Sequence, residues 1–497
     1  MSLEFSKKLV AHTTSIPGVV LYDLPVHGDS RGWFKENWQR EKMVALGLPD
    51  FRPVQNNISF NEKAGTTRGI HAEPWDKFIS VATGRIFGAW VDLREGPSFG
   101  AVFTAELDPS QAIFIPRGVG NAFQTLEDNT AYTYLVNDHW SADAQDQYTF
   151  LNLADETAAV QWPISLDKAE LSDKDKAHPR LADVAPMPSK KILVVGANGQ
   201  LGKALRDLYE DDTSVEFAGR SEFDLNNRHA FSSMNWKNYS TIINAAAYTA
   251  VDAAETSEGR AAAWAVNVSA VTRLAQAAVQ HDLTLVHVSS DYVFDGSQPE
   301  HTESEQLSPL GVYGQTKAAG EAIVSVVPKH YIVRTSWVIG EGNNFVLTMA
   351  SLAARGVKPA VVNDQTGRLS FTRDIAAGIR HLLQSGATYG TYNLSNSGKP
   401  QSWADIAQDV FDIVGASRAD VTGLSTEEYF RDKIAAPRPL NSTLDLTKIM
   451  DTGFVPREAD AALEEYLATR ASGLADHNAI RRHRIPGQKL RENGHGN

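Results

Sequence analysis

Residues 1–165 contain short runs of apolar, β-branched and aromatic residues separated by Gly, Pro and Asp. The close spacing leaves no helical segments between the runs, which is typical of antiparallel strands joined by turns. This part of the chain is therefore predicted to be all-β, as a sandwich or a jelly roll. The runs that carry the prediction are 18–24, 77–93, 100–107, 111–116 and 130–136.

The pattern changes at about Lys190. From there, strand-like apolar runs alternate with longer runs that have helical periodicity. Strands that alternate with helices predict an α/β fold with a parallel, doubly wound sheet. The alternating runs are 191–197, 200–211, 241–247, 261–280 and 283–290.

Two segments outside these patterns are polar. Residues 165–190 contain three prolines, and composition alone marks the whole stretch as a linker. Residues 472–497 are polar and locally basic, which favours a solvated tail over a binding arm.

The chain has 497 residues, a formal net charge of −13 and no cysteine. Such a charge repels phosphate groups, which argues against general binding to nucleic acid or a membrane surface but not against one nucleotide ligand. The absence of cysteine excludes disulfides and thiolate sites and fits a reducing compartment. No apolar stretch approaches about 20 residues and the N-terminus lacks a signal-peptide pattern, so we expect a cytoplasmic protein.

A glycine-rich loop follows the first strand predicted after Lys190. Gly196, Gly199 and Gly202 lie between this strand and the next predicted helix. In this position glycines let the backbone approach the pyrophosphate of a dinucleotide, and the helix N-terminus supplies N–H donors. The loop therefore predicts a dinucleotide cofactor.

The residues after the second strand bear on which cofactor is used. The strand SVEFAGR ends in Arg220, near the expected adenosine ribose, and a basic residue there favours the 2′-phosphate of NADPH. Glu222 and Asp224 follow closely, and an acidic residue would instead bind a 2′-hydroxyl. NADPH is therefore the expected cofactor, with NADH as the alternative.

Tyr313 and Lys317 are four residues apart, so on a helix they share a face. A Tyr hydroxyl has an unperturbed pKa near ~10, and a nearby ammonium moves that pKa toward the working pH. Ser290 ends another predicted strand, at the edge where doubly wound sheets bind ligands. The three residues predict a site in which Tyr313 protonates a ketone oxygen while the cofactor delivers hydride.

These residues and a series of further motifs resemble the extended short-chain dehydrogenases, and among them the dTDP-4-dehydrorhamnose reductase family. The similarity covers about residues 190–468 and implies a Rossmann-type sheet with a smaller substrate-binding lobe. The further motifs are 244–255, 289–296, 334–340, 342–345, 361–368, 371–376 and 436–444.

The resemblance implies specific contacts. Ser290, Asp291 and Trp337 are expected at the substrate. Ser290 stands where the family usually has Thr, which keeps the hydroxyl, and the segment RLSFTRD lacks a usual proline. Some members need Mg²⁺ at a dimer interface; no ligands for it can be mapped here, so that requirement stays open. The residues implied at the cofactor are Gly199, Gln200, Leu201, Asp224, Leu225, Ala246, Ala247 and Tyr248.

The all-β half offers few metal ligands. Residues 1–165 contain four histidines and no His-x-His pair, so we expect no metal site. His71 alone would be a core or surface residue, whereas Arg68, Lys77 and Tyr134 make a general base the alternative. The four histidines are His12, His27, His71 and His139.

Motifs in this half resemble the dTDP-4-dehydrorhamnose 3,5-epimerase family over about residues 14–185. The resemblance implies that Lys174 and Asp175 fold back onto the sandwich and that Asp175 orients His71. The predicted linker then shrinks to about 182–189. The motifs are 29–36, 54–57, 67–71, 113–126, 161–164 and 171–175. The expected parts of the chain are a jelly-roll (cupin-like) domain at 1–185, a reductase domain at 190–470 and a tail at 472–497.

The chemistry that this family implies is consistent with the residues present. A ketone at C4 acidifies the hydrogens at C3 and C5, and histidine, with an unperturbed pKa near ~6.5, suits their removal. Lys77 would stabilise the enolate oxygen, and Tyr134 would return a proton from the other face. The residues implied at the substrate are Arg31, Glu36, Gln55, Asn57, Arg68, Lys77, Asn121 and Lys174.

Three departures from the family pattern leave details open. Asn121 stands where a histidine is usual, Gln145 stands where an acidic residue is typical, and the loop after His71 is short. The base and the acid are kept. The nucleotide contacts and the choice between C3, C5 or both stay open.

The two resemblances name consecutive steps of one pathway. The leading hypothesis is a homo-oligomeric bifunctional enzyme that acts on a dTDP-linked 4-keto-6-deoxysugar, first epimerising it and then reducing it with NADPH. One alternative keeps both activities on another nucleotide or sugar. A second makes the all-β half a non-catalytic dimerisation or sugar-binding module on a working reductase.

Overall fold

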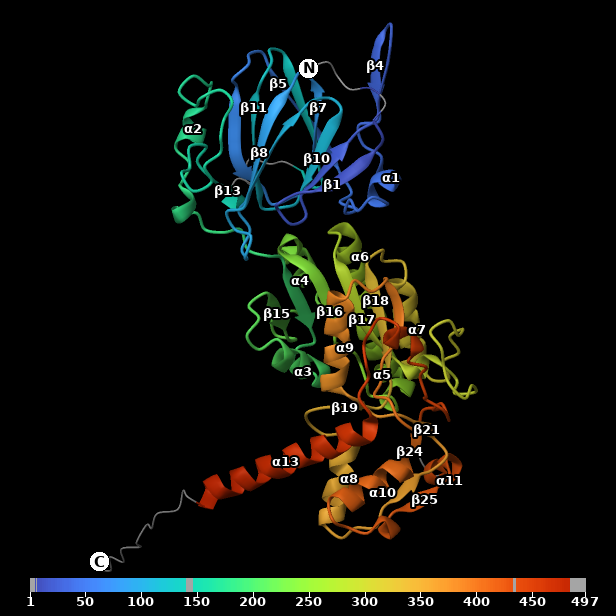
Figure 1. Cartoon of the computed structure of the whole chain (residues 1–497). Helices are drawn as coiled ribbons and strands as arrows, with labels where there is room; N and C mark the ends of the chain where they lie inside the picture. Colours follow the sequence, from blue (N-terminus) through green and yellow to red (C-terminus); the bar gives the residue numbers. More distant parts are fainter. Residues whose placement is uncertain (1–4, 6, 140–145, 432–434, 483–497) are drawn as a thin grey trace, which may run out of the picture. The chain divides into compact units, whose positions relative to one another are not determined.

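The computed structural model describes residues 5, 7–139, 146–431 and 435–482, with side chains as far as Arg470 (Figure 1). Its contacts divide the chain into two compact units, Met1–Ser189 and Lys190–Asn497, which we call unit 1 and unit 2. Gln145 and the end of the predicted tail, 483–497, lie outside the described residues. No helix of the described part is long and apolar enough to cross a membrane.

Unit 1 consists mainly of two antiparallel sheets (Figure 1). One has the order β1 (Val10–Thr13), β2 (Val20–Asp23), β10 (Gln111–Ile115), β7 (Lys77–Thr83), β12 (Thr130–Val136), β5 (Gln55–Asn61). The other has the order β13 (Thr149–Phe150), β6 (Thr67–Ala72), β11 (Val119–Thr125), β8 (Ile86–Asp92), β9 (Val102–Leu107).

The main core of unit 1 lies between these sheets. Ile79 and Tyr132 from the first sheet pack with Trp90 and Phe123 from the second, and all four are at most 4% exposed. Each strand alternates inward and outward residues, so one face of each sheet can be apolar. The remaining elements are a hairpin of β3 (Val26–Asp29) and β4 (Gly32–Lys35), α1 (Arg40–Val44), α2 (Asp173–Lys176) and η2 (Leu181–Asp183).

The segment predicted as a linker is part of unit 1. The backbone N–H of Met187 donates to Leu93 O at 2.7 Å, and the N–H of Glu95 donates to Met187 O at 2.9 Å. Val184 and Met187 are buried in an apolar cluster. The prediction of a linker at 182–189 is therefore wrong for residues 182–187, because the buried side chains of Val184 and Met187 anchor this segment.

Unit 2 is built on a six-stranded parallel sheet. Val194 of the first strand packs on one face of the sheet and its neighbours Leu193 and Val195 on the other, as expected of a sheet covered on both faces. The strand order is β15 (Val215–Ala218), β14 (Lys191–Val195), β16 (Tyr239–Asn244), β17 (Thr284–Ser290), β18 (His330–Thr335), β23 (Gly390–Asn393).

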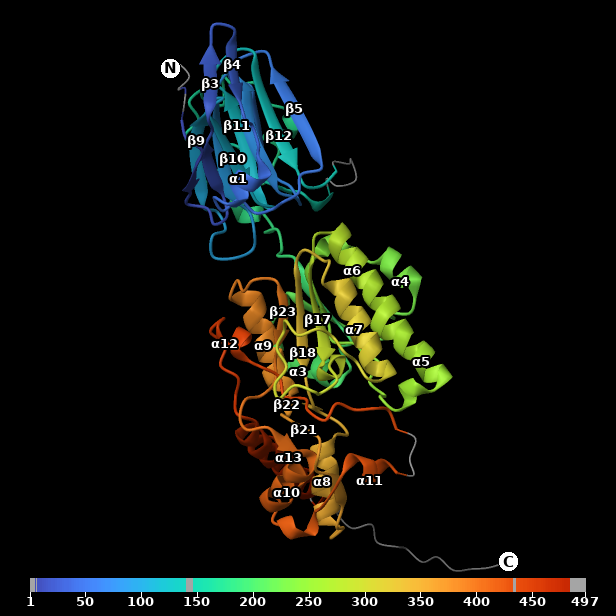
Figure 2. The ribbon, with the colours of Figure 1, turned by 90° about the vertical axis from the view of Figure 1, so that its right-hand side faces the viewer.

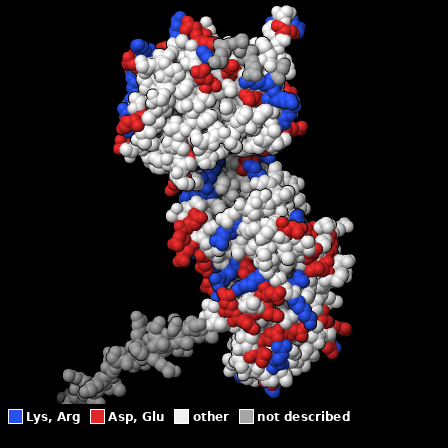
Figure 3. Space-filling view, in the orientation of Figure 1, with Lys and Arg blue, Asp and Glu red and all other residues white. Residues whose placement is uncertain are grey.

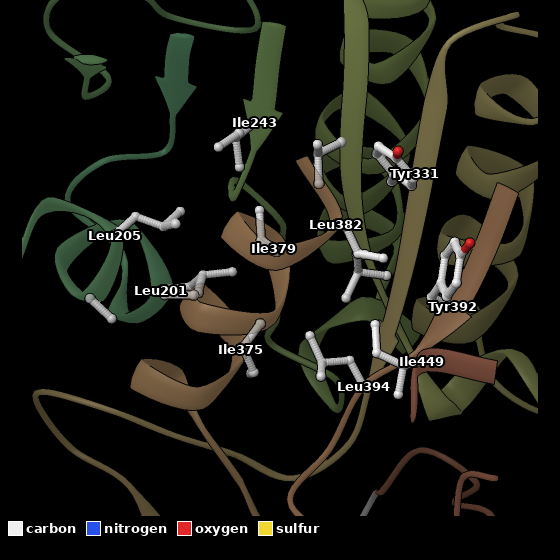
Figure 4. Close-up of a cluster of buried hydrophobic side chains, with 14 of the residues drawn as sticks. Leu201, Leu205, Ile243, Tyr331, Ile375, Ile379, Leu382, Tyr392, Leu394 and Ile449 are labelled. Carbon is white, nitrogen blue, oxygen red and sulfur yellow. The ribbon is translucent and has the colours of Figure 1, made fainter. Parts of the chain in front are cut away.

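Helices cover both faces of this sheet. Figure 2 shows α5 (Ser257–Trp264), α6 (Val271–Gln280) and α7 (Val312–Val324) side by side on one face. On the other face, α3 (Gln200–Leu208) packs against α9 (Thr372–Gln384), and Figure 4 shows their leucines and isoleucines meeting strand residues. Further short helices are α4 (Arg228–Ser233), η3 (Trp236–Asn238), η4 (Ala253–Glu255), the π-helical η5 (Ala265–Ala270) and η6 (Asp291–Val293).

The strand order reverses direction at β14. The chain leaves β14 for β15 on one side and then returns to β16 on the other. The loops at the carboxyl ends of β14 and β16 therefore diverge and leave a crevice, which is where open α/β sheets bind ligands. The glycine loop that starts at Gly196 lies at this point.

A smaller lobe with its own apolar core completes unit 2. Charged side chains of both signs are interspersed on the face shown in Figure 3. The last helix continues to Arg482, so part of the segment predicted as a tail is helical. The lobe and its connections contain β19 (Val338–Ile339), α8 (Phe345–Ala354), β20 (Ala360–Val362), β21 (Thr366–Gly367), β22 (Ser370–Phe371), β24 (Gln401–Ser402), α10 (Trp403–Ile413), η7 (Arg418–Asp420), β25 (Thr422–Leu424), α11 (Thr426–Phe430), α12 (Thr447–Met450) and α13 (Ala459–Arg482).

Candidate active sites

Unit 1 contains a cavity of about 560 Å³. It is lined by the four residues that the sequence predicts to be catalytic in this half. His71 lies on β6, Lys77 on β7, Tyr134 on β12 and Asp175 on α2. Both sheets and the segment after them therefore contribute to one space, and His71 meets a residue 104 positions away.

His71 and Asp175 form a hydrogen-bonded pair, with 2.9 Å between Nε2 and Oδ1. The backbone N–H of Asp175 donates to Oγ of Ser172, the residue that caps α2. Burial opposes ionisation of Asp175, but the hydrogen bond from His71 and the neighbouring imidazoles outweigh it and lower the pKa of the carboxyl group. A carboxylate only accepts, so Nε2 of His71 carries the proton and Nδ1 is free to take one.

His178 is a third member of this group that sequence reasoning missed. Its Nε2 is 3.3 Å from the same oxygen of Asp175, and its ring stacks on Phe150 with 4.6 Å between centroids. Burial and the proximity of His71 lower the pKa of His178. The metal argument considered only residues 1–165; a histidine three residues after Asp175, just beyond the end of α2, was the available signal.

The three ligand atoms of His71, Asp175 and His178 lie within 4.8 Å of one another, a spacing at which a metal could be held. The prediction of no metal site therefore rested on an incomplete set of histidines. Asp175 is hydrogen-bonded to His71, and the absence of a metal from this group stays a prediction.

Lys77 and Tyr134 are neighbours in the lining of the cavity, on the paired strands β7 and β12. Nζ of Lys77 lies 5.0 Å from the centroid of the Tyr134 ring. Burial lowers the pKa of Lys77 to about 7. Burial also raises the pKa of Tyr134, an effect that the nearby Arg68 opposes. Tyr134 is therefore protonated at neutral pH and can donate.

Four of the residues predicted at the substrate line this cavity: Arg68, Lys77, Asn121 and Lys174. The side chain of Asn121 is engaged by the core. Its Oδ1 accepts from Nε1 of Trp90 at 3.0 Å, and its Nδ2 donates to the hydroxyl of Tyr132 at 3.0 Å. Asn121 therefore shapes the wall beneath the catalytic groups.

The other four do not line the cavity of their own chain. Arg31, at the tip of the β3–β4 hairpin, pairs with Asp29, and its side chain is 87% exposed. Glu36 pairs with Lys42 at 2.7 Å. The hairpin strands pair with each other and not with either sheet, so they carry these residues outward.

Gln55 and Asn57 lie closer to the cavity, on β5. They are four and two residues from Ser59, which lines it, so the three share one face of the strand. Nε2 of Gln55 donates to Oδ1 of Asn57 at 2.8 Å. The strand therefore continues the line of polar groups from the cavity to the sheet edge.

Unit 2 contains a cavity of about 720 Å³ at the crevice described above. It brings together most residues predicted in this half, from the glycine loop to the lobe. Those that line it are Gly196, Gly199, Gln200, Leu201, Arg220, Ala246, Ala247, Ser290, Asp291, Tyr313, Lys317 and Trp337.

The glycines of the loop are required by close approach of the backbone. Gly196 has a φ of +81°, and a Cβ there would lie 2.6 Å from the amide nitrogen of Ala246. A Cβ at Gly202 would lie 2.3 Å from the carbonyl oxygen of Gly196. Gly202 thus packs the helix onto the loop, while Gly199 caps α3 and leaves its first N–H groups toward the cavity.

Two further residues predicted at the cofactor, Asp224 and Leu225, are not part of the cavity lining. Asp224 pairs with Arg220 at 3.7 Å, and the Arg220 side chain is 82% exposed. Leu225 is buried in the core beside the sheet. Glu222 accepts a hydrogen bond from the N–H of Gly219 at 2.8 Å, so acidic and basic groups both stand at the end of β15.

Tyr313 and Lys317 lie one turn apart on α7, both buried. Nζ of Lys317 donates to Val288 O at 2.6 Å, and burial lowers the pKa of Lys317 to about 8, opposed by Glu321. Burial and the charge of Asp291 raise the pKa of Tyr313 to about 12. The expectation that Lys317 lowers the pKa of Tyr313 is therefore wrong for this structure, because burial dominates and Lys317 is directed to a carbonyl.

Ser290 and Asp291 lie beside Tyr313. Oγ of Ser290 donates to Oδ1 of Asp291 at 2.8 Å, and burial raises the pKa of Asp291 to about 6. On the lobe side, Trp337 stacks on Trp403 with 3.8 Å between centroids. Trp403 was missed from sequence because its distance from Trp337 along the chain hides this contact.

Tyr248 does not line the cavity but is held next to it by Asn267, a second residue missed from sequence. Oδ1 of Asn267 accepts from the N–H of Tyr248 at 2.9 Å, and its Nδ2 donates to Oγ1 of Thr316 at 3.0 Å. Asn267 lies in the π-helical η5, a geometry that often occurs at functional sites. No sequence signal marked it within an alanine-rich helix.

Both units are similar to known families. The family profile described as RmlD substrate binding domain matches residues 190–472, and the profile described as dTDP-4-dehydrorhamnose 3,5-epimerase matches residues 13–183. The chain is 50% identical over 182 residues to the protein RmlC homolog of Streptococcus pyogenes, covering 36% of this chain and 91% of the relative.

Unit 2 also matches relatives over almost their whole length. The chain is 40% identical over 296 residues to dTDP-4-dehydrorhamnose reductase of Aggregatibacter actinomycetemcomitans, covering 56% of this chain and 98% of the relative. The solved structure of dTDP-4-dehydrorhamnose reductase from Bacillus anthracis in complex with NADP matches with 32% identity and a TM-score of 0.53, covering 57% and 99% of the two chains. Both resemblances seen in the sequence are thus confirmed, and the chain belongs to the dTDP-4-dehydrorhamnose 3,5-epimerase family through unit 1 and to the RmlD family through unit 2.

Proposed function

We propose that this chain is a bifunctional enzyme of dTDP-L-rhamnose synthesis. Unit 1 epimerises dTDP-4-dehydro-6-deoxy-D-glucose at C3 and C5, and unit 2 reduces the C4 ketone of the product with NADPH. The observation that carries the proposal is that one chain joins members of two families whose named reactions are consecutive. We assign unit 1 to the jelly-roll (cupin-like) class and unit 2 to the Rossmann-type class with a substrate-binding lobe.

The geometry of unit 1 supports proton transfer at carbon. Nδ1 of His71 removes the proton next to the C4 ketone, and Asp175 stabilises the imidazolium that forms. The electrons move to the C4 oxygen, where the ammonium of Lys77 stabilises the enolate. Tyr134 returns a proton to the opposite face of the carbon, which inverts it.

The geometry of unit 2 supports ketone reduction. When bound, NADPH supplies the hydride that is added to C4. Tyr313 gives its hydroxyl proton to the C4 oxygen, and Lys317 provides the local positive charge. The Ser290 hydroxyl, which donates to Asp291, turns to hold that oxygen by a hydrogen bond. The glycine loop fits a dinucleotide because Gly196 and Gly199 line the cavity and Gly199 caps α3, whose N-terminal N–H groups suit a pyrophosphate.

Arg220 supports the choice of NADPH, since its exposed guanidinium stands at the end of β15, where a 2′-phosphate would be bound. The B. anthracis relative holds NADP. Glu222 at the same place keeps NADH as the second candidate, and a comparison of the two cofactors at equal concentration decides between them.

The direct test uses the whole chain. We expect purified enzyme given dTDP-4-dehydro-6-deoxy-D-glucose and NADPH to consume NADPH and yield dTDP-L-rhamnose, identified by NMR. The same assay with the UDP-linked 4-keto sugar is the matched comparison. Equal turnover of the UDP sugar would contradict the nucleotide assignment, and no NADPH consumption with either would contradict the reductase.

We also propose that unit 1 works as a homo-oligomer. Arg31 and Glu36, expected at the substrate, are carried away from the cavity of their own chain and would reach that of a second copy. The edge strand β5 exposes Ile58 (69%) and Phe60 (57%), and the hairpin exposes Phe34 (66%). Unpaired edges with exposed apolar side chains favour association with another chain.

Replacing Phe60 by glutamate is expected to weaken this association, because each interface would bury an unpaired charge. We expect light scattering to show a particle at least twice the 54.3 kDa chain mass for the wild type and a smaller one for Phe60→Glu. Val455→Glu, at an apolar residue of unit 2 that is 81% exposed, is the control. A monomeric wild type, or equal masses for wild type and Phe60→Glu, would exclude this interface.

A further inference from the structure

Glu73 lines the same cavity as His71 and has no role in the mechanism described above. It lies in the loop between β6 and β7, and its carboxylate contacts Nζ of Lys77, four residues later. The side chains are 12% and 6% exposed. An ion pair thus stands inside the candidate active site, where water screens it little.

The other carboxylates near Lys77 have different partners. Asp76 accepts hydrogen bonds from the N–H of Arg117 at 2.8 Å and from Nδ2 of Asn137 at 3.0 Å. Asp175 is bonded to His71, and Glu170 lies at 3.4 Å from Oγ1 of Thr66. The uncharged ring of Tyr134 covers Nζ of Lys77 from β12. The remaining groups of the cavity lining that can carry a positive charge are Arg68, Lys174 and, with its lowered pKa, His178.

The chemistry of the site requires a charged Lys77. Burial lowers the pKa of Lys77 to about 7 in this site, so at neutral pH the neighbouring charges decide how much of it is the ammonium. A carboxylate in contact favours the ammonium and opposes this loss. Arg68 and Lys174, being positive, act in the opposite direction.

We infer that Glu73 is a positioning residue that keeps Lys77 as an ammonium aimed at the developing C4 enolate oxygen. The inference rests on the proposed epimerase activity. Glu73 itself neither gives nor takes the proton that moves at C3 or C5. Its effect is greatest at the pH values at which an unpaired buried lysine loses its proton.

The test is the pH dependence of deuterium uptake at C3 and C5 in D₂O, with the full chain and without NADPH. We expect Glu73→Gln to move the basic limb of the profile to lower pH by one unit or more. At pH values above the basic limbs of both proteins, the rate of the variant should be at least tenfold below that of the wild type. Near the acidic limb the difference should be less than threefold. Glu73→Asp should restore part of the shift, and Glu170→Gln, at a carboxylate of the same cavity, should leave the profile unchanged.

A Glu73→Gln profile that coincides with that of the wild type would overturn the inference. A uniform loss at every pH would also overturn it, since Glu73 would then act in some way other than through the protonation of Lys77. No uptake by the wild type would count against the epimerase and not against the ion pair. The ion pair has its own readout, the NMR titration of ¹³Cε-labelled Lys77, assigned with Lys77→Arg; an unchanged midpoint in Glu73→Gln would refute the inference.

Discussion

Replacement of His71 by alanine is expected to lower deuterium uptake at C3 and C5 of the 4-keto sugar by a factor of about 10² to 10⁴, the usual contribution of a general base. His71 lines the cavity, and because its Nε2 is held by Asp175, Nδ1 is the ring atom assigned to accept the proton. The alanine variant keeps the cavity and Lys77 but has no group to accept the proton. NMR of the sugar in D₂O without NADPH measures this step apart from reduction.

His12→Ala is the matched control, because His12 is a half-exposed histidine paired with Asp23 on the outer strands of unit 1. It should exchange like the wild type. The wild-type chain must itself show uptake; if it does not, unit 1 is a non-catalytic module on a working reductase. Undiminished uptake by His71→Ala would show that another group is the base, with His178 as the next candidate.

Replacement of Tyr313 by phenylalanine is expected to lower NADPH-dependent turnover by a factor of about 10² to 10⁴, because the proton donor at the C4 oxygen is removed. With its pKa raised to about 12, Tyr313 is protonated at neutral pH and ready to donate. The ring and its packing remain, so binding of cofactor and substrate should change little. Turnover is followed by NADPH absorbance with the epimerised sugar as substrate.

Tyr292→Phe provides the control for this variant. Tyr292 lines the same cavity, and its ring lies 5.4 Å from that of Tyr313 in an edge-to-face contact. Loss of its hydroxyl should leave most of the turnover. Normal turnover by Tyr313→Phe would refute the assigned donor, and an equal loss in both variants would show that the two hydroxyls act together.

Lys317 adds a pH dependence to the same reaction. It acts as a cation, and its pKa is lowered to about 8 by burial, so its charge is present below about pH 8 and is lost above it. Turnover by unit 2 should therefore decline above about pH 8. Glu321 opposes the effect of burial on the pKa of Lys317, so the decline should begin at a higher pH than it would without Glu321.

The elements of the fold follow from local pattern. Alternating strands and helices after Lys190 and closely spaced strands before it were both predicted correctly, because burial of one or both faces imposes a period on the sequence. The glycine loop was also predicted from the chain alone, since its close backbone contacts exclude side chains within a few residues. These features depend on neighbours that are near in sequence.

The pairings that make the sites depend on tertiary structure. The approach of Asp175 to His71 was expected only through the resemblance, and the place of His178 beside both was missed, because the segment after the sandwich had to fold back onto it. The protonation of Tyr313 was predicted in the wrong direction because spacing on a helix shows that Lys317 is near but not how deeply the pair is buried.

The sequence by itself thus determined two catalytic units, the glycine loop and the residues proposed to be catalytic in each cavity. Tertiary structure decided which of those groups touch, and which further side chains, such as Glu73 and Asn267, contact them. It also placed Arg31 and Glu36 away from the cavity of their own chain. The reason is physical: periodicity reports burial along one element, whereas hydrogen bonds and pKa values are set by whatever other elements bring into contact.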